Sequence, residues 1–540
     1  MTDPSLRLDR LSYVLPDGRT LFSHLDETLD GRPTGLVGRN GAGKSVLAQI
    51  LAGQLQPSAG RCTASGPVHY LAQQVSAPHG STVASLAGVQ PALDALARIE
   101  AGSVAPDDFD AVAGRWDIRQ QLQAELEGSG LGHLHADIAA EMLSGGEAMR
   151  VSLIGAMLSN ADFLILDEPT NHLDRSARQS LLRQLQRWPR GLLVISHDRV
   201  LLDSMARIVE LSSLGLQSYG GNYTCYAESK VLAQQNAIAQ LEQRKQERKR
   251  DERSMREQMA RQQRRQARAD RAGKDANQAK ILLGGQKARS EMSAGKLRQQ
   301  HAAARADLAD RVRTAALHVD AATPIVLHAL PAAQAGLVAH RRVVALEGAV
   351  LPFVSPPMDR VDLIVQGRQR IAVVGPNGCG KSTLLKVLAG QLEPLAGSCR
   401  RAADTVYLDQ RLVSLDRAQS VLAQLRTVNR TATEGHLRMM LAHLGLDAGK
   451  IVAPSGALSG GEQLKAALAC ALYADSPPQL LLLDEPSNHL DLPSTQALEA
   501  MLRGYPGAML VVSHDDAFLS SLALTERLVA TEGGWRLEAC

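Results

Sequence analysis

The chain has 540 residues, enough for two or three domains that each bury their own core. Apolar residues make up 45% of it but aromatic residues only 3%, so leucine, valine, isoleucine and alanine have to form those cores. The formal net charge of +3 is small, yet the charge is unevenly distributed along the chain.

Cysteine spacing and hydropathy exclude several classes of protein. The six cysteines have no paired spacing, which argues against disulfides or a zinc site and favours thiols in a reducing cytosol. The first residues lack a basic patch followed by an apolar run, so we expect no secretory signal peptide. No uncharged apolar run approaches the roughly 20 residues that cross a bilayer. We therefore expect a cytoplasmic protein without membrane helices of its own.

The first unit, residues 1–222, has the pattern of a parallel α/β domain. Residues 7–13 and 34–37 are expected as strands, and the second of them ends at a glycine-rich turn. The helix after that turn is Lys44–Leu51, and residues 192–195 form an apolar run typical of a buried parallel strand. Strands separated by helices in this order imply right-handed crossovers and a mostly parallel sheet.

A phosphate-binding loop lies at residues 38–45, which read Gly-Arg-Asn-Gly-Ala-Gly-Lys-Ser. The glycines let backbone N–H groups curl around phosphate oxygens at the N-terminus of a helix. Lys44 is expected to bridge the β- and γ-phosphates, and the Ser45 hydroxyl to bind Mg²⁺. The candidate nucleotide-binding residues are Gly38, Asn40, Gly41, Gly43, Lys44, Ser45 and Val46.

Asp167 and Glu168 follow an apolar strand in the same unit. An aspartate at this place can hold Mg²⁺, directly or through water, and the next carboxylate can polarise the water that attacks the γ-phosphate. The alternative is an acidic pair that opens a turn before Pro169. The phosphate loop upstream favours the catalytic interpretation.

Residues 223–322 differ in composition from the segments on either side. No proline occurs between Pro189 and Pro324, and good helix formers dominate. Residues 241–300 hold 18 lysines and arginines against 8 acidic residues, a surplus of +10. We expect two long helices that fold back as a hairpin, with the bend in the glycine-containing segment 271–285. A solvated spacer helix is the alternative, although this surplus exceeds what solubility needs.

Residues 323–540 repeat the first unit. Residues 375–382 read Gly-Pro-Asn-Gly-Cys-Gly-Lys-Ser, and Lys381 lies 337 residues after Lys44. Glu485 lies only 317 residues after Glu168, so the first copy holds about 20 extra residues, expected near 95–116. The second set of candidate site residues is Gly375, Asn377, Gly378, Gly380, Lys381, Ser382, Thr383, Asp484 and Glu485, with Mg²⁺ expected at Ser382 and Asp484.

Three further motifs occur in both copies. Residues 143–147 and 458–462 read Leu-Ser-Gly-Gly-Glu, Asn-His-Leu-Asp occurs at 171–174 and 488–491, and Ser-His-Asp at 196–198 and 513–515. With these motifs the chain resembles the ABC ATPase superfamily and, because of its basic linker, the soluble ABC-F proteins. The resemblance implies an α/β fold with two P-loop ATP-binding cassettes, residues 1–222 and 323–540, joined by a basic α-helical hairpin at 223–322. The extra residues near 95–116 resemble the arm in the first cassette of many ABC-F proteins.

The resemblance implies roles for several residues beyond the phosphate loops. It makes His197 and His514 the switch histidines, which contact the γ-phosphate and help to place the water. It makes Gln73 and Gln410 the Q-loop glutamines, which add a contact to Mg²⁺ or water, although Gln74 leaves the first assignment open by one residue.

The signature loops are expected to act across the two cassettes. In the superfamily each presses on the γ-phosphate bound by the other cassette, so Lys44 shares a site with Ser459 and Lys381 with Ser144. The signature residues are Ser144, Gly145, Gly146, Ser459, Gly460 and Gly461. Asp174 and Asp491 are expected at the seam, the interface between the two cassettes.

An aromatic ring usually stacks on the adenine in this superfamily. Tyr13 is the candidate in the first cassette and Phe353 in the second. Departures from the family pattern are small: Val46, Ala148 and Ser487 stand where threonine, glutamine and threonine are usual, and they are expected to slow one site relative to the other.

For function, the resemblance implies a ribosome-associated translation factor that hydrolyses ATP, acts as a monomer with paired cassettes, and contacts rRNA and tRNA. The linker of ABC-F proteins reaches toward the peptidyl-site tRNA and the peptidyl-transferase centre, and a basic hairpin suits phosphate-rich RNA. Antibiotic protection of the ribosome is a variant of this hypothesis. Two alternatives stay open: an ATPase subunit of a membrane transporter, which has no use for the linker, and a DNA-associated ATPase, which would carry zinc modules or longer coiled coils.

Overall fold

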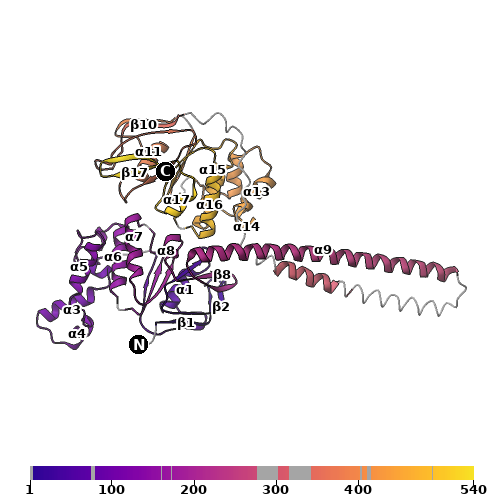
Figure 1. The fold of residues 1–540 in the computed structure, drawn as a ribbon, viewed down its shortest axis with the longest axis horizontal. Helices are drawn as coiled ribbons and strands as arrows, with labels where there is room; N and C mark the ends of the chain where they lie inside the picture. Colours follow the sequence, from indigo (N-terminus) through magenta and orange to yellow (C-terminus); the bar gives the residue numbers. More distant parts are fainter. Residues whose placement is uncertain are drawn as a thin grey trace. The chain divides into compact units, whose positions relative to one another are not determined.

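The computed structural model describes residues 4–73, 79–159, 161–171, 173–275, 299, 302–314, 342–401, 404–409, 415–488 and 490–540. They divide into two compact units (Figure 1). Met1–Thr224 and Ile325–Cys540 form the first unit, which holds both cassettes, and Cys225–Pro324 forms the second.

The first cassette contains a three-stranded antiparallel sheet and a six-stranded sheet. The small sheet has the order β2-β1-β4, and the large one β5-β6-β7-β3-β8-β9. Neighbouring strands from β5 to β8 pair in parallel, and only β9 is antiparallel, which confirms the expected mostly parallel sheet. The strands are β1 Leu6–Val14, β2 Thr20–Leu29, β3 Thr34–Gly38, β4 Ala59–Ala64, β5 Val68–Leu71, β6 Phe163–Asp167, β7 Gly191–Ile195, β8 Arg207–Ser212 and β9 Gly215–Gly220.

The helices of the first cassette include α1, which coincides with the helix expected after the phosphate loop and packs against β3, β5 and β6. The helices are α1 Lys44–Leu51, α2 Val83–Leu86, α3 Gln90–Glu100, α4 Pro106–Val112, α5 Ile118–Gly128, α6 Gly145–Leu158, α7 Arg175–Gln186 and α8 Arg199–Asp203, with a 3-10 turn, η1, at Ala140–Met142.

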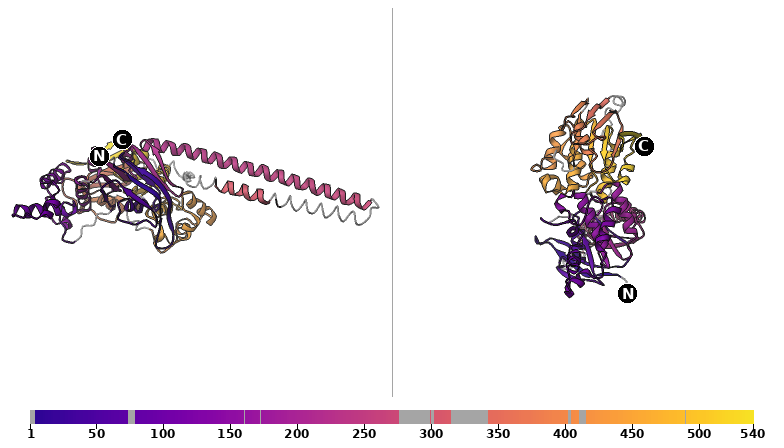
Figure 2. Two further views of the ribbon diagram at one scale, coloured as in Figure 1. Left: turned by 90° about the horizontal axis from the view of Figure 1, so that it is seen from below. Right: turned by 90° about the vertical axis from the view of Figure 1, so that its left-hand side faces the viewer.

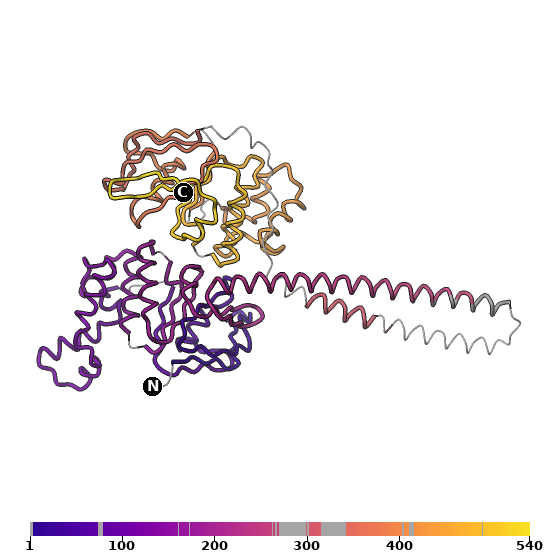
Figure 3. The backbone as a smooth tube through the Cα atoms, viewed as in Figure 1, coloured from indigo at the N-terminus to yellow at the C-terminus, as the bar shows by residue number. Residues whose placement is uncertain are grey.

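Helices α3 and α4 lie where the extra residues of the first copy are expected. They pack against each other and project from the rest of the cassette (Figures 1 and 3). Matching isolated bridges, Thr82 with Ala139 and Ser420 with Pro454, bracket this region in the two cassettes. Between its bridge residues the second cassette has only α12 Val421–Val428, α13 Glu434–His443 and α14 Ala448–Val452.

The second cassette repeats this architecture with sheets β11-β10-β13 and β14-β15-β16-β12-β17-β18. Its strands are β10 Arg342–Val350, β11 Arg360–Gln366, β12 Arg370–Val374, β13 Ala396–Arg401, β14 Thr405–Leu408, β15 Leu480–Asp484, β16 Ala508–Val512, β17 Glu526–Thr531 and β18 Gly534–Ala539. Its remaining helices are α11 Lys381–Ala389, η2 Ser455–Ala457, α15 Gly460–Leu472, α16 Leu492–Gly504 and α17 Asp516–Ser521.

Aliphatic side chains build the cores, as the composition requires. Every residue of β6, β7, β15 and β16 is buried, because helices cover both faces of a parallel sheet. The largest fully buried side chains are aromatic, Phe163, Tyr505 and Phe518. The buried strands β6 and β15 therefore carry Asp167 and Asp484 at rigid, fixed positions at their carboxyl ends.

The linker unit is dominated by α9, Tyr223–Asp275, a helix of 53 residues and roughly 80 Å at 1.5 Å per residue (Figure 2). Residues 302–314 are helical too. This second helical segment runs beside α9 (Figures 1 and 2). Hydrogen bonds from Arg244 and Gln243 hold the pKa of Glu247 below its usual value, and the charge of Arg311 adds to this. Residues 271–275 of the expected bend still belong to α9, and the rest of that segment lies outside the described residues.

Along α9 several basic side chains pair with acidic side chains one turn away. Arg244 with Glu247 and Arg253 with Glu257 are examples, at 2.8 and 3.2 Å. Within the part of the chain that the structure describes, no helix is long and apolar enough to cross a membrane.

Candidate nucleotide-binding sites

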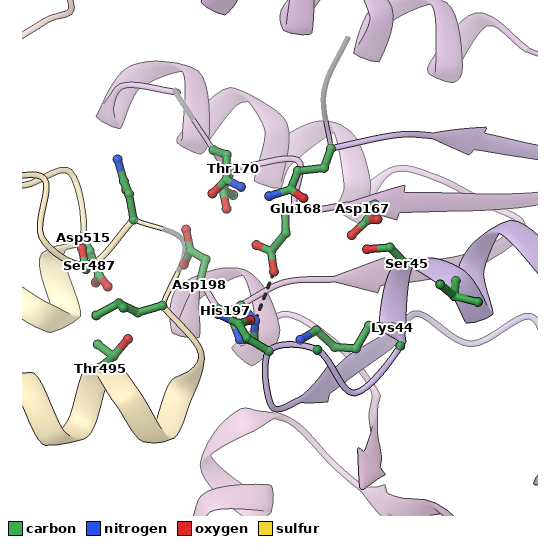
Figure 4. Close-up of a pocket in the computed structure, with 18 of the residues that line it drawn as sticks. Lys44, Ser45, Asp167, Glu168, Thr170, His197, Asp198, Ser487, Thr495 and Asp515 are labelled. Carbon is green, nitrogen blue, oxygen red and sulfur yellow. Dashed lines mark ion pairs between the residues drawn. The ribbon is translucent and has the colours of Figure 1, made fainter. Parts of the chain in front are cut away.

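A cavity of about 520 Å³ lies over the first phosphate loop and is lined by both cassettes (Figure 4). The first cassette supplies the phosphate loop, Asp167 at the end of β6, Glu168 directly after it, and His197. The second cassette supplies Ser487, Asn488, Leu490, Thr495 and Asp515. A matching cavity of about 320 Å³ lies over the second phosphate loop, where Leu173 and Arg178 come from the first cassette.

The phosphate loops have the backbone that their glycines predict. Gly43 caps α1 with a φ of 98°, and Gly380 caps α11 with a φ of 97°, conformations that favour glycine. A Cβ on Gly43 would lie within 3 Å of the Leu21 side chain of β2, and one on Gly380 within 3 Å of the Val354 side chain, which lies between β10 and β11. These glycines let the loop wrap closely over the helix N-terminus, where N–H groups attract anions.

The loop lysines are held over their own loops. Lys44 Nζ donates to the carbonyl oxygens of Gly38 and Arg39 at 2.8 and 3.2 Å, and Lys381 Nζ makes the same pair of bonds in the second loop. Burial lowers the pKa of Lys44, and the charges of Glu168, Asp491 and Asp167 oppose this shift. Each ammonium group thus lies beside the acidic residues of its site, where it can bind phosphate.

The two strand-end aspartates have one satisfied and one unsatisfied oxygen. Tyr70 donates to Asp167 Oδ2 at 3.2 Å, and Tyr407 donates to Asp484 Oδ2 at 3.1 Å. The other oxygen, Oδ1, is buried in both residues and has no hydrogen-bond partner. Burial raises the pKa of Asp167, while hydrogen bonds from Ser45 and Tyr70 lower it.

This arrangement fits a magnesium ion. A free carboxylate oxygen beside a serine hydroxyl supplies two oxygen ligands, and Mg²⁺ in nucleotide sites takes the others from phosphate and water. Among the described residues no cluster of three acidic, histidine or cysteine side chains could hold a metal without such help. Ser45, Gln73 and Asp167 all line the first cavity, and Ser382 and Asp484 the second, while Gln410 lies outside the described residues.

Glu168 and Glu485 have the same unusual backbone conformation in the two sites. Both have a φ of 50°, a left-handed conformation that costs a non-glycine residue roughly 1–2 kcal/mol. Backbone N–H bonds to Ile195 O and Val512 O, at 2.8 and 2.9 Å, hold this conformation in each copy. Strain repeated at the same place in both cassettes indicates a functional position.

Each glutamate lies against the histidine that is expected to act as the switch. Glu168 Oε1 is 3.4 Å from His197 Nε2 (Figure 4), and Glu485 Oε1 is 3.4 Å from His514 Nε2. Burial raises the pKa of Glu168 and raises that of Glu485 to about 7. Burial also lowers the pKa of His197 and lowers that of His514 to about 4, so both imidazoles are neutral at pH 7. A neutral imidazole next to a carboxyl group of raised pKa can share or relay a proton.

The two cassettes touch at matching points of their sites. The backbone N–H of Asn40 donates to Asp491 Oδ2 at 2.9 Å. Burial raises the pKa of Asp174, but hydrogen bonds that include one from the Asn377 backbone lower it overall. Asp174 and Asp491 therefore lie at the seam, as expected, each at the phosphate loop of the other cassette.

The signature serines cap helices instead of lining the cavities. Ser144 and Ser459 are the N-caps of α6 and α15, with capping boxes completed by Glu147 and Glu462. Gly145, Gly146, Gly460 and Gly461 form the first turns of these helices, and none of the six signature residues lines either cavity. However, the charge of Arg39 acts on Lys465 of α15, so this signature helix lies near the opposite phosphate loop. The sharing of sites by the signature loops stays a prediction.

The two candidate adenine-stacking residues lie in different surroundings. Phe353 lines the second cavity and is 92% exposed, which suits a stacking platform. The Tyr13 ring lies 6.3 Å from that of Phe22 and packs on the core of the small sheet. Leu15, Arg19 and Leu21 line the first cavity in its place, so Tyr13 stays a prediction that this geometry does not favour.

Sequence reasoning missed Tyr70, Tyr407 and Arg178. The tyrosines are separated by 337 residues, the interval between the loop lysines, and this interval could have identified them. Arg178 has no such signal, because the equivalent residue 317 positions later is Thr495.

Comparisons with known proteins agree with this geometry. Residues 27–171 and 358–488 match the family model described as ABC transporter. The tylosin resistance ATP-binding protein TlrC of Streptomyces fradiae is 32% identical, over 92% of each chain. The ribosome protection protein VmlR of Bacillus subtilis is 27% identical, over 97% of this chain and 87% of that protein. ABC transporter F family member 2 of Arabidopsis thaliana is 28% identical, over 96% of this chain and 75% of that protein.

A solved structure shows the same fold at lower sequence identity. The archaeal ribosome recycling factor aABCE1, in complex with the ribosomal stalk protein aP1, superposes with a TM-score of 0.59 at 20% identity, over 98% of this chain and 89% of that one. Along the sequence, a helical linker separates two cassettes of the matching family, whose domains bind and hydrolyse ATP. The chain belongs to the ABC-F family of ATP-binding cassette ATPases.

Proposed function

We propose that this chain is a translation factor that acts on the ribosome and hydrolyses ATP to ADP and phosphate at two composite sites. The observation that carries the proposal is the combination of two paired ATPase cavities with a basic helical linker in one chain. A transporter subunit has no use for the +10 surplus of residues 241–300, whereas phosphate-rich RNA attracts it.

In the proposed reaction each glutamate acts as general base. Glu168 and Glu485, held in a fixed backbone conformation, take a proton from the water that attacks the γ-phosphate. The lysine of each loop neutralises phosphate charge. Mg²⁺ held by Asp167 and Ser45, or by Asp484 and Ser382, would neutralise charge on the β- and γ-phosphates.

Closure of the cassettes completes both sites in this proposal. Residues of the opposite cassette line each cavity, and Asp491 accepts a hydrogen bond from the first phosphate loop. ATP between the cassettes would hold them together, and hydrolysis would let them part. The signature helices add their N-terminal dipoles to the γ-phosphates of the opposite cassette.

The linker supplies the contact with RNA. Helix α9 is long enough to extend roughly 80 Å, and most of its described side chains are exposed. The name of VmlR assigns ribosome protection to that relative, and the archaeal neighbour was solved with a ribosomal stalk protein. We infer that the linker of this chain reaches toward the peptidyl-site tRNA and the peptidyl-transferase centre, and that the protein works as a monomer in the cytoplasm.

Sedimentation tests ribosome binding. A chain with Glu168→Gln and Glu485→Gln should bind ATP without hydrolysing it and sediment with ribosomes. Its binding should weaken as salt is added, because each phosphate contact releases counterions. Absence of the trapped chain from the ribosomal fractions at low salt contradicts the proposal.

A replacement of the linker tip tests the role of the hairpin. A short Gly-Ser turn in place of residues 264–289, most of which lie outside the described residues, should leave ATP hydrolysis intact and abolish the effect on in vitro translation. Unchanged activity in translation supports the spacer-helix alternative instead.

Antibiotic protection is a variant of this function, favoured by the name of the relative TlrC. It predicts that expression of the chain raises the drug concentration that inhibits growth, and that the tip replacement removes this effect. Equal inhibitory concentrations with and without the chain, over a panel of drugs that bind the peptidyl-transferase centre, exclude it.

A further inference from the structure

Arg178 lies where the two ATP sites meet. It belongs to the first turn of α7, its side chain is 16% exposed, and it lines both cavities. Its Nη1 donates to Asp198 Oδ2 of its own cassette and to the backbone carbonyl of His514 in the other cassette, both at 3.3 Å. Its Nε donates to Leu173 O at 3.2 Å, which fixes the direction of the side chain. One guanidinium thus bridges the two switch-histidine loops.

The equivalent position in the second cassette, 317 residues after Arg178, carries no charge. Thr495 occupies it on α16, and its hydroxyl donates to Asp491 O at 3.1 Å within the same helix turn. Thr495 lines only the first cavity, as far as the described residues define it. The interface between the cassettes is therefore asymmetric at this position.

The charges around the two histidines show the same asymmetry. Lys44 of its own cassette and Asp491 of the other act on His197. The equivalent residues, Lys381 and Asp174, act on His514, and Arg178 is the additional group there. The charges that act on the two histidines match except for this cation.

We infer that Arg178 is a positioning residue, supplied by the first cassette, for ATP hydrolysis in the second site, and that the first site has no equivalent. The inference rests on the proposed hydrolysis of ATP at two sites. The bond to the His514 carbonyl holds the loop whose imidazole lies 3.4 Å from Glu485 and 3.2 Å from Asn377 Oδ1. Small displacements of such groups cost a large part of the rate.

The contact also depends on closure. Because Arg178 and His514 belong to different cassettes, their hydrogen bond exists only when the cassettes are together. The second site then has the backbone of its histidine loop held by a bond from the other cassette. Beside the His197 loop the contact between the cassettes is instead a side-chain ion pair of 2.9 Å between Arg199 and Glu499, and Thr495 gives that loop's backbone no bond. Closure and hydrolysis are coupled more tightly in the second site than in the first.

Single-site chains test the inference. In the Glu168→Gln chain only the second site keeps its catalytic glutamate. In the Glu485→Gln chain only the first site does. Arg178→Thr gives both cassettes a threonine at this position. It should lower kcat of the Glu168→Gln chain roughly 10- to 100-fold with little change in KM. The loss in the Glu485→Gln chain should be at least about 10-fold smaller, and Arg178→Lys should recover part of kcat in the second site.

Arg175 provides the matched control. It lies on the same helix and makes an ion pair of 3.1 Å with Asp516 across the same seam, but it lines neither cavity. Arg175→Thr should change kcat of both single-site chains equally and by less than about 3-fold, as expected for an exposed ion pair.

The outcomes separate the inference from the function on which it rests. Equal losses from Arg178→Thr in both single-site chains, or an equal loss from Arg175→Thr, overturn the positioning role. So does a Glu168→Gln chain without single-turnover hydrolysis beside an active wild type, because the second site then does not work as proposed. A wild-type chain that hydrolyses no ATP refutes the proposed function itself.

Discussion

The two ATP sites share their reacting groups and differ in what surrounds them. Loop lysine, strand-end aspartate, tyrosine partner, strained glutamate and neutral histidine recur in both with nearly equal distances. The surroundings differ at Arg178 and Thr495, at Leu15 and Phe353, and at Val46 and Thr383.

This difference indicates which groups the chemistry requires. Groups that touch phosphate or water are fixed by the reaction and are repeated in both copies. Groups that hold a loop or face the adenine can vary between the sites. Such differences can make the rate of hydrolysis in one site differ from that in the other. The four predictions below test whether the repeated groups are equivalent and whether the varied ones are not.

The largest effect is expected at the glutamates. Glu168→Gln with Glu485→Gln should lower kcat roughly 10²- to 10⁴-fold and leave ATP binding intact, because an amide fills the same space but accepts no proton. Phosphate release and nucleotide binding measure the two quantities. Equivalent sites predict that either single change removes about half of the activity, and near-wild-type release by the double variant contradicts the role of both residues.

A smaller loss is expected at the signature helices. Ser459→Arg should lower hydrolysis by the site of Lys44 roughly 10²-fold, because a bulky side chain at the start of α15 blocks closure over the opposite loop. Loss of the N-cap itself costs only about 1 kcal/mol of stability. Thr433→Arg removes a cap from α13, which lines neither cavity, and controls for that loss. Fast hydrolysis by residues 1–222 alone would falsify the sharing of sites.

A third prediction concerns the stability cost of a buried base. Burial raises the pKa of Glu485 to about 7 from an ordinary value of 4.5. Below pH 4.5 the carboxyl group is protonated in both states and costs nothing; from pH 4.5 to 7 the unfolded chain alone ionises, and stability falls as pH rises. Glu485→Gln should therefore increase the free energy of unfolding at pH 8 by on the order of 3 kcal/mol, with little gain at pH 4.5.

Denaturant titrations at the two pH values measure this difference. Glu532→Gln, at an exposed position, provides the control and should change stability little at either pH. A loss of stability in the Glu485→Gln chain at pH 8 would show that the carboxylate is stabilised in the folded protein and not penalised by burial.

Local sequence predicted the repeated groups, and tertiary contacts decided the varied ones. Helix Lys44–Leu51 follows from glycines that only a phosphate loop requires, and β6 and β15 follow from apolar runs that end in Asp-Glu. Arg178 could not be predicted, because its function depends on His514, which is 336 residues away and in contact only through the pairing of the cassettes. Tyr13 has the right residue type, but its ring turns to Phe22 in the core.

The smallest effect is expected at the tyrosines that orient the aspartates. Tyr407→Phe removes the hydroxyl that donates to Asp484 Oδ2 at 3.1 Å and leaves the ring in place. The carboxylate then loses the bond that holds its Oδ2, so the site should need about 10-fold more Mg²⁺ for half-maximal activity. Tyr70→Phe should act alike on the first site, because the two bonds are equivalent. Magnesium titrations of chains that keep only one of the two catalytic glutamates measure the effect on each site.

Tyr505→Phe is the control, because it removes a buried hydroxyl that is bonded to Pro478 O and lines neither cavity. A shift of the same size in the control chain would show that lost stability, and not the orientation of the aspartates, changes the requirement for Mg²⁺.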